Sequence, residues 1–280
     1  MLCAVSASAR AVEVVDSIRL TDRQFMYYEI HGDGTPVLLI HGHTLDRRMW
    51  NAQVEPLVQA GYKVIMPDMR GYGLSSDPEE GQAFTHTDDM VRLLDSLNVG
   101  QAHIVGLSLG AAIAGELMIL HPDRCLSCMM IGGEPFSGAG PHTPRSAQDI
   151  AKKKQDIAKM KKKDLDAYRR SRANSLVKIG GSHAEDMREE ITKIVCDWGC
   201  WQPLHVTTRI YYASEAWNYL KDHPNAVRTM LVYGDKDYKS YKTCKYKSDT
   251  KTEIVPDCGH MVNMERPDCF NPILLEWLAE

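Results

Sequence analysis

Short, nearly continuous apolar runs alternate with helical stretches along most of this 280-residue chain. Such runs are typical of strands that are covered on both faces of a sheet. They span Val37–Ile40, Val64–Met66, His103–Val105, Leu126–Ile131, Met230–Tyr233 and Thr252–Val255. Helical patterns occur at Arg47–Ala60, Thr87–Leu97, Leu109–Leu120 and Pro267–Ala279. The alternation predicts an α/β fold with a doubly wound, mostly parallel sheet and right-handed crossovers.

Two earlier runs, Val12–Leu20 and Phe25–Ile30, flank the polar Thr21-Asp22-Arg23 and predict an antiparallel hairpin. Together with the six later runs they indicate an eight-stranded sheet. The alternation stops between about Phe136 and Asn225, where no strand-like run occurs. We therefore expect a core domain made of 12–135 and 226–280, with a helical cap inserted at 136–225. Residues 1–11 are expected to be disordered or the remnant of a signal peptide.

The overall composition is that of an ordinary globular chain, but its charge is unevenly distributed. Thirty-three basic and 37 acidic residues give a net charge of −4, which is no signature of nucleic-acid binding. No apolar run reaches the length of about 18 residues that a membrane span needs. Between Ala151 and Arg172, however, ten basic residues face three acidic ones, so this basic block carries +7. It could be a solvated helix face, a surface that attracts anionic substrates, or a contact for an acidic partner or lipid surface.

Neither the N-terminus nor the cysteines decide the compartment. The start, Met-Leu-Cys-Ala-Val-Ser-Ala-Ser-Ala, resembles the end of a secretory signal but lacks its basic region, so both a cytoplasmic and an exported protein are consistent with it. Eight cysteines are too few for a disulfide-built scaffold, and no Cys/His quartet of suitable spacing completes a zinc site. His41 and His43 have no third ligand close by in the sequence. No metal is expected.

The strongest local motif is Gly106-Leu107-Ser108-Leu109-Gly110, directly after one predicted strand and directly before a predicted helix. In that context G-x-S-x-G forms a tight, strained turn that exposes the serine hydroxyl above the sheet. The amide that follows the serine is then available to a developing oxyanion. Ser108 is therefore the candidate nucleophile.

A serine needs a base to become nucleophilic, and the base needs an acid to orient it. Among eleven histidines, His260 is the best placed, because it follows the last predicted strand. For the acid, Asp237 follows the preceding strand and gives the order Ser…Asp…His. Asp235 and Glu134 are alternatives, since both also follow predicted strands.

Taken together, these motifs resemble those of the α/β-hydrolase superfamily over about residues 25–280, apart from the insertion. The matching segments are His41-Gly42-His43, Asp68–Ser75, Gly106–Gly110, Gly234–Asp237, Gly259-His260 and Glu265-Arg266-Pro267. The resemblance implies a catalytic triad of Ser108, Asp237 and His260. It also implies an oxyanion hole made by the amides of His43 and Leu109, and a cap over the pocket.

By this resemblance the chain is expected to be a carboxylesterase-like hydrolase (EC 3.1.1) that cleaves a small or medium ester or lactone through an acyl-enzyme, without a cofactor. His43, Trp198 and Trp201 are expected to contact the substrate, and a monomer or homodimer is expected. Ser108 argues against epoxide hydrolases and haloalkane dehalogenases, in which an aspartate is the nucleophile. A carbon–carbon bond hydrolase or a perhydrolase of the same fold stays open. So does a non-catalytic member of the family that binds a small ligand or a partner.

Overall fold

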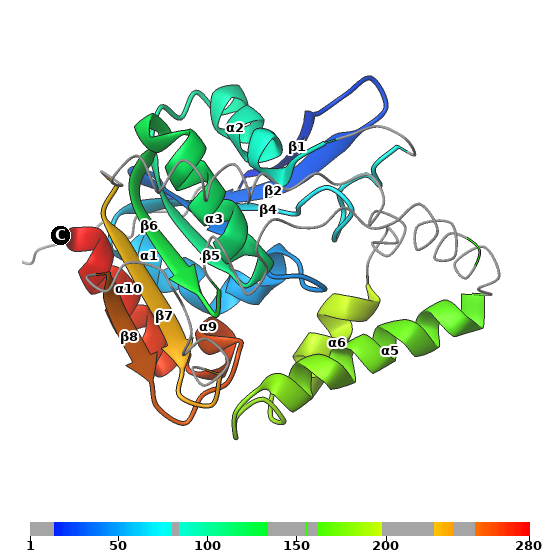
Figure 1. Ribbon diagram of the computed structural model, residues 1–280. Coiled ribbons are helices and arrows are strands. Elements are labelled where there is room, and N and C mark those ends of the chain that lie inside the picture. Colours follow the sequence, from blue (N-terminus) through cyan, green and yellow to red (C-terminus); the bar gives the residue numbers. More distant parts are fainter. Residues whose placement is uncertain (1–13, 80–83, 134–154, 156–161, 198–226, 238–249) are drawn as a thin grey trace, which may run out of the picture.

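A computed structural model of the protein describes residues 14–79, 84–133, 155, 162–197, 227–237 and 250–280 (Figure 1). Eight strands form one sheet in the order β1-β2-β4-β3-β5-β6-β7-β8. Strands β3 to β8 run parallel to one another, whereas β2 pairs antiparallel with both β1 and β4. The predicted doubly wound, mostly parallel sheet is confirmed.

The strands lie where the apolar runs predict them. Their bounds are β1 Val14–Arg19, β2 Phe25–His31, β3 Thr35–Ile40, β4 Tyr62–Pro67, β5 Ala102–Leu107, β6 Cys125–Ile131, β7 Thr229–Gly234 and β8 Lys251–Val255. All six residues of β5 are buried, as expected for a strand covered on both faces. The predicted hairpin is formed by β1 and β2, with Val14 opposite Ile30 and Arg19 opposite Phe25.

The helices cover the two faces of the sheet and follow the predicted stretches closely. Their bounds are the 3₁₀ turn η1 Arg47–Trp50, α1 Asn51–Gln59, α2 His86–Ser96, α3 Leu109–Leu120, the 3₁₀ turn η2 Pro122–Arg124, α5 Lys162–Ile179, α6 Arg188–Cys196, α9 Val262–Glu265 and α10 Pro267–Ala279. Side chains of α2 and α3 pack on one face of the sheet, and those of α1 and α10 pack on the other.

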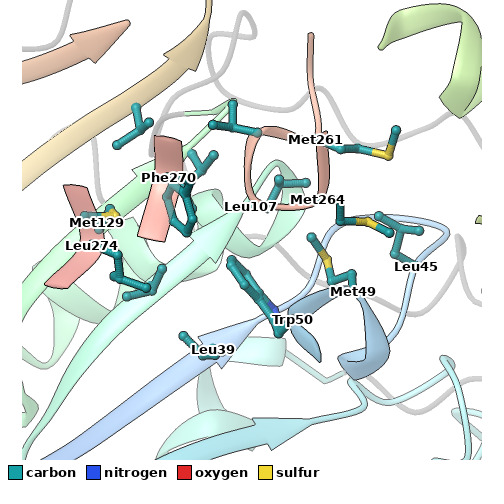
Figure 2. Close-up of a cluster of buried hydrophobic side chains, with 14 of the residues drawn as sticks. Leu39, Leu45, Met49, Trp50, Leu107, Met129, Met261, Met264, Phe270 and Leu274 are labelled. Carbon is teal, nitrogen blue, oxygen red and sulfur yellow. The ribbon is translucent and has the colours of Figure 1, made fainter. Parts of the chain in front are cut away.

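Alternation of side chains along each strand divides the core into two clusters. On β3, Val37 and Leu39 join the cluster under α1 and α10, while Leu38 and Ile40 join the cluster under α2 and α3. Figure 2 shows the first cluster around Trp50, with Leu39, Leu107 and Met129 from the strands. Met261 and Met264, from the segment that follows His260, belong to the same cluster. The position of that segment is thus fixed by core packing.

The helices α5 and α6 lie within the predicted insertion and pack against each other. Figure 1 shows them beside the end of the sheet toward which the arrowheads of β6 and β7 point. Ala173, Leu176 and Ile191 are buried in the same cluster as the α10 side chains. Arg48 in η1 also donates to the carbonyl of Ile194 and to Asp197. The α5–α6 pair is therefore attached to the core by both apolar and polar contacts.

In the part of the chain that the structure describes, no helix is long and apolar enough to cross a membrane.

Candidate active site

Ser108 occupies a strained turn between β5 and α3. Its backbone has φ 55° and ψ −109°, a left-handed conformation that L residues other than glycine seldom adopt. The turn also crowds its neighbours, since a Cβ on Gly106 would stand 2.1 Å from the carbonyl oxygen of Gly110. A Cβ on Gly110 would stand 2.1 Å from the carbonyl oxygen of Ile40. Both glycines of the motif are thus required by close backbone contacts.

The amide of Leu109 is the first amide of α3, a helix of 12 residues. Amides in the first turn of a helix have no partner within the helix, and the helix dipole makes this end positive. An anion that forms near Ser108 can accept a hydrogen bond there. The oxyanion role of Leu109 stays a prediction.

His260 and Asp237 are in direct contact. His260 Nδ1 lies 2.8 Å from Asp237 Oδ2, and each side chain is only 12% exposed. Because a carboxylate only accepts hydrogen bonds, the proton of the neutral imidazole is on Nδ1. Nε2 is then left with its lone pair, the form in which a histidine can act as a base.

The alternative acid Asp235 has a different set of contacts. Its Oδ1 accepts a hydrogen bond from the amide of Cys258 at 3.0 Å, and its Oδ2 lies 3.2 Å from Lys236 Nζ. The hydrogen bond from Cys258 holds the pKa of Asp235 below its usual value. Asp235 therefore stabilises the loop before His260 rather than the imidazole itself. Glu134, the other alternative, lies outside the described residues.

Two glycines after β6 lie between Ser108 and His260. A Cβ on Gly133 would stand 3.3 Å from Ser108 Cα, and a Cβ on Gly132 would stand 3.1 Å from His260 Nδ1. On another side, a Cβ on Gly42 would stand 3.7 Å from Ser108 Cβ. The structure thus gathers the serine turn, the histidine loop and the loop after β3 at one edge of the sheet.

The loop after β3 is held by backbone and side-chain groups of the Asp68–Ser75 segment. His41 is fully buried: its Nδ1 donates to the carbonyl of Gly42, and its Nε2 accepts from the amide of Met69. Burial lowers the pKa of His41 to about 4, so it is a neutral structural group. His43 is partly buried, and its Nδ1 lies 2.8 Å from the hydroxyl oxygen of Tyr72.

Backbone strain recurs in this loop. Thr44 follows His43 and has φ 68°, an unusual value for a β-branched residue. Asp257, in the loop before His260, has φ 52°. Among the four non-glycine residues with positive φ in the described ranges, only Asn98 is distant from the three loops gathered here. Strain of this kind accumulates at functional sites, where the surrounding structure enforces it.

Other predicted site features are only partly within the described residues. Trp198 and Trp201 lie outside them, as do residues 151–154 and 156–161 of the basic block. Within that block, Arg169 on α5 donates from its guanidinium nitrogen Nη1 to the carbonyl oxygen of Cys196 at 3.4 Å. Cys125 and Cys128 are buried thiols on β6. Within the described part of the chain, no three His, Cys, Asp or Glu side chains are grouped so that they could hold a metal ion.

One residue at the site, Glu265, is not among the predicted site residues. It belongs to the matching segment Glu265-Arg266-Pro267; in the structure it ends the short helix α9 and is 5% exposed. Its carboxylate accepts hydrogen bonds from the amides of Gly259 and Met261, on either side of His260. No residue type marks these partners in the sequence, because they are backbone amides.

Comparisons with known proteins agree with the fold described above. The model of the alpha/beta hydrolase fold family matches residues 35–183. The chain is 25% identical over 275 residues to the AB hydrolase superfamily protein YisY of Bacillus subtilis, covering 93% of this chain and 97% of that protein.

Solved structures resemble the chain over nearly its whole length. An esterase from Thermogutta terrifontis has a TM-score of 0.70 at 22% identity, covering 97% of this chain and 98% of that one. Epoxide hydrolase A from Mycobacterium thermoresistibile also has a TM-score of 0.70, at 18% identity, with 96% and 98% covered. At these identities the structures establish a shared fold.

Proposed function

The chain belongs to the alpha/beta hydrolase fold family, and from this premise we propose that it is a serine hydrolase of carboxylic esters or lactones. The observation that supports this most is the 2.8 Å contact between His260 Nδ1 and Asp237 Oδ2, at the sheet edge where Ser108 occupies its strained turn. A base that is oriented by a carboxylate, near a partly buried serine in a strained turn, suits nucleophilic acyl transfer.

In this mechanism His260 Nε2 takes the hydroxyl proton as Ser108 Oγ attacks the substrate carbonyl. The amides of His43 and Leu109 stabilise the oxyanion of the tetrahedral intermediate. The intermediate collapses to an acyl-enzyme when the alkoxide leaves with the proton from His260. Water then repeats the attack with His260 as base, which releases the acid and restores Ser108. No metal or organic cofactor is required.

We propose that residues 136–225 form a cap over this site, with α5 and α6 as its described part. Their contacts with the histidine loop and with η1 support the assignment. The substrate would then be enclosed between the sheet edge and the cap. His43 is proposed as a contact because it adjoins the serine turn, and Trp198 and Trp201 remain proposals from the sequence.

An aspartate at position 108 would favour epoxide opening, because that reaction proceeds in this family by carboxylate attack. The serine at this position favours acyl transfer instead. The two classes can be separated by offering an epoxide in the same assay as the esters. Hydrolysis of the epoxide at a rate comparable to the best ester would contradict the proposal.

The decisive experiment compares the wild type with Ser108→Ala on p-nitrophenyl esters of graded chain length and on a lactone panel. We expect the wild type to be at least about 10³-fold faster on its best substrate, since the variant keeps only binding and oxyanion stabilisation. A serine-directed phosphonate should label the wild type and not the variant. Equal rates for both proteins, together with no labelling, would overturn the proposal.

The assignment of the acid is tested with a matched pair of variants. Asp237→Asn should lower kcat by about 10⁴-fold, because the amide favours the wrong imidazole tautomer. Asp235→Asn is two residues away and contacts the loop amide of Cys258 instead, so a loss of tenfold or less is expected. If Asp235→Asn abolished activity and Asp237→Asn kept it, the acid would be Asp235.

A further inference from the structure

Glu265 is a buried carboxylate that the proposed chemistry does not use. Its Oε1 accepts from the amide of Met261 at 3.1 Å, and its Oε2 accepts from the amide of Gly259 at 2.9 Å. Oε2 also accepts from the amide of Gly181 at 2.6 Å. One side chain thus joins the loop on both sides of His260 to the segment that follows α5.

The amide of His260 itself is bound by that same segment. It donates to the carbonyl of Ile179, the last residue of α5, at 3.3 Å. Three successive amides, at positions 259, 260 and 261, therefore all donate outward. Two of them reach Glu265, and the middle one reaches α5. The backbone that carries His260 is held by these contacts and not by a regular strand or helix.

The two segments touch backbone to backbone. A Cβ on Gly259 would stand 2.4 Å from the amide nitrogen of Gly181, and a Cβ on Gly181 would stand 2.8 Å from the amide nitrogen of Gly259. Only glycines allow this approach. Because both amides also donate to Glu265 Oε2, a shift of either segment changes the hydrogen bonds of the other.

Glu265 is itself firmly positioned. It ends α9, whose Asn263 is fully buried and donates to the carbonyl of Met49 at 2.8 Å. Met261 and Met264, which flank Asn263 in the sequence, are buried in the core (Figure 2). An ionised carboxylate is the only side chain that offers acceptors to three amides without presenting a donor. Glutamine would place an NH₂ group against at least one of these amides.

From these contacts we propose that Glu265 is a positioning residue, which aligns His260 with Asp237 only while the segment after α5 is docked. The kinetic test of this proposal rests on the proposed function. Its spectroscopic test, described below, does not. Orientation of the imidazole would then be coupled to the proposed cap, through one carboxylate and the contact between Gly181 and Gly259. A misplaced base costs rate without loss of substrate affinity.

The main test is Glu265→Gln, measured on the best ester substrate of the wild type. We expect kcat to fall by about 10- to 100-fold while KM changes by less than about threefold. The second readout needs no substrate. It is the far-downfield proton resonance of the hydrogen bond between His260 Nδ1 and Asp237, assigned by its loss in Asp237→Asn. In Glu265→Gln this resonance should broaden or disappear.

Glu116→Gln is the matched control. Glu116 is another buried carboxylate, on α3, and it accepts from Thr87 Oγ1 at 2.6 Å. If losing a buried carboxylate merely loosened the protein, both variants would lose kcat and the resonance alike, and that result would overturn the proposal. Glu265→Asp keeps the charge but has a side chain one methylene shorter. Its kcat and its resonance should resemble those of Glu265→Gln. If Glu265→Asp instead kept the kcat and the resonance of the wild type, only the charge of Glu265 would matter, and the positioning role would be refuted.

Gly181→Ala tests the same coupling by changing the segment after α5 instead of Glu265. It also provides a second test if Glu265→Gln does not fold. The added methyl should displace this segment from Gly259, lower kcat by about tenfold and weaken the resonance. If Gly181→Ala folds and has the same kcat and the same resonance as the wild type, the coupling is refuted. If the wild type has no more turnover than Ser108→Ala, the proposed function fails, and the resonance still decides the role of Glu265.

Discussion

Strain at single residues is concentrated where the proposed chemistry occurs. Ser108 and Thr44 both have positive φ, and each lies in a loop at the same edge of the sheet. Conformations of this kind cost about 1–3 kcal/mol each and persist only where the surroundings enforce them. Here the enforcing contacts are backbone contacts at glycines. The stability of the site therefore depends on residues that have no side chain.

This dependence predicts that Gly110→Ala is destabilising although alanine is the better helix former. Its Cβ would stand 2.1 Å from the carbonyl oxygen of Ile40, and this backbone atom of a central strand cannot move aside cheaply. We expect the free energy of unfolding to fall by about 2–3 kcal/mol in urea titrations. Gly100→Ala is the control, because it is exposed and has nothing within 4 Å of its Cβ. A change within about 0.5 kcal/mol is expected there, and equal losses in both variants would contradict the argument.

How far the sequence predicts the site depends on the kind of residue. Ser108, His260 and Asp237 could be singled out because each follows a strand, and parallel strands end at one edge. The sequence favours Asp237 but leaves Asp235 as an alternative, since both follow β7 and the turn determines which carboxylate reaches His260. Glu265 was not recognised as a site residue because its partners are backbone amides, which leave no residue-type signature.

At the scale of elements, the strands were predictable and the attachment of the insertion was not. Apolar runs locate each strand within two residues at most ends, because the central strands are buried on both faces and carry mainly apolar side chains. The edge strand β8 differs from the expectation, since it is largely exposed although its run is apolar at Ile254 and Val255. The sequence predicts that the insertion is helical, but α5 and α6 are attached through contacts far apart in the chain. Arg48 donates to Asp197 and to the carbonyl of Ile194, almost 150 residues away.

Arg48 should therefore contribute much more to stability than its exposed partner does. Its guanidinium also binds Asp46, whose side chain is completely buried, whereas Asp197 is half exposed. Arg48→Met leaves the Asp46 carboxylate without its cation, so we expect a loss of about 2–3 kcal/mol in urea unfolding. Asp197→Ala should cost less than about 1 kcal/mol.

A double variant shows whether the stability loss of Arg48→Met comes from the unpaired Asp46 carboxylate or from lost packing of Arg48. If the cost of Arg48→Met comes from the unpaired carboxylate, then Asp46→Asn combined with Arg48→Met should be more stable than the sum of the single losses predicts. Limited proteolysis should also cleave the α5–α6 segment faster in Arg48→Met, since α6 loses two hydrogen bonds to the core. Additive losses with unchanged proteolysis would show that Arg48 contributes by packing alone.

At the scale of the molecule, the sheet separates two apolar clusters, and buried polar groups lie at its edges. Such groups are fixed in one ionisation state, which makes the stability of the whole fold depend on pH. His41 is the clearest case, because it is fully buried and both ring nitrogens are engaged. A second proton would have to be placed on Nε2, facing the amide hydrogen of Met69.

This predicts a specific acid sensitivity. Burial lowers the pKa of His41 from 6.5 to about 4, so the folded state holds the neutral ring while the unfolded chain takes up a proton. The contribution of His41 is therefore complete above about pH 6.5 and is lost as the pH falls toward 4. Between pH 7 and pH 5 the loss amounts to about 2 kcal/mol.

The measurement compares the wild type with His41→Gln by urea unfolding at pH 7, 6 and 5. Glutamine offers a donor and an acceptor but does not titrate, so the variant should lose about 2 kcal/mol less than the wild type over this range. Burial raises the pKa of Asp89 to about 6, which acts in the opposite direction, but Asp89 is present in both proteins and its effect cancels in the comparison. Parallel curves for the two proteins would mean that His41 takes up a proton as readily in the folded state as in the unfolded chain, and would contradict the prediction.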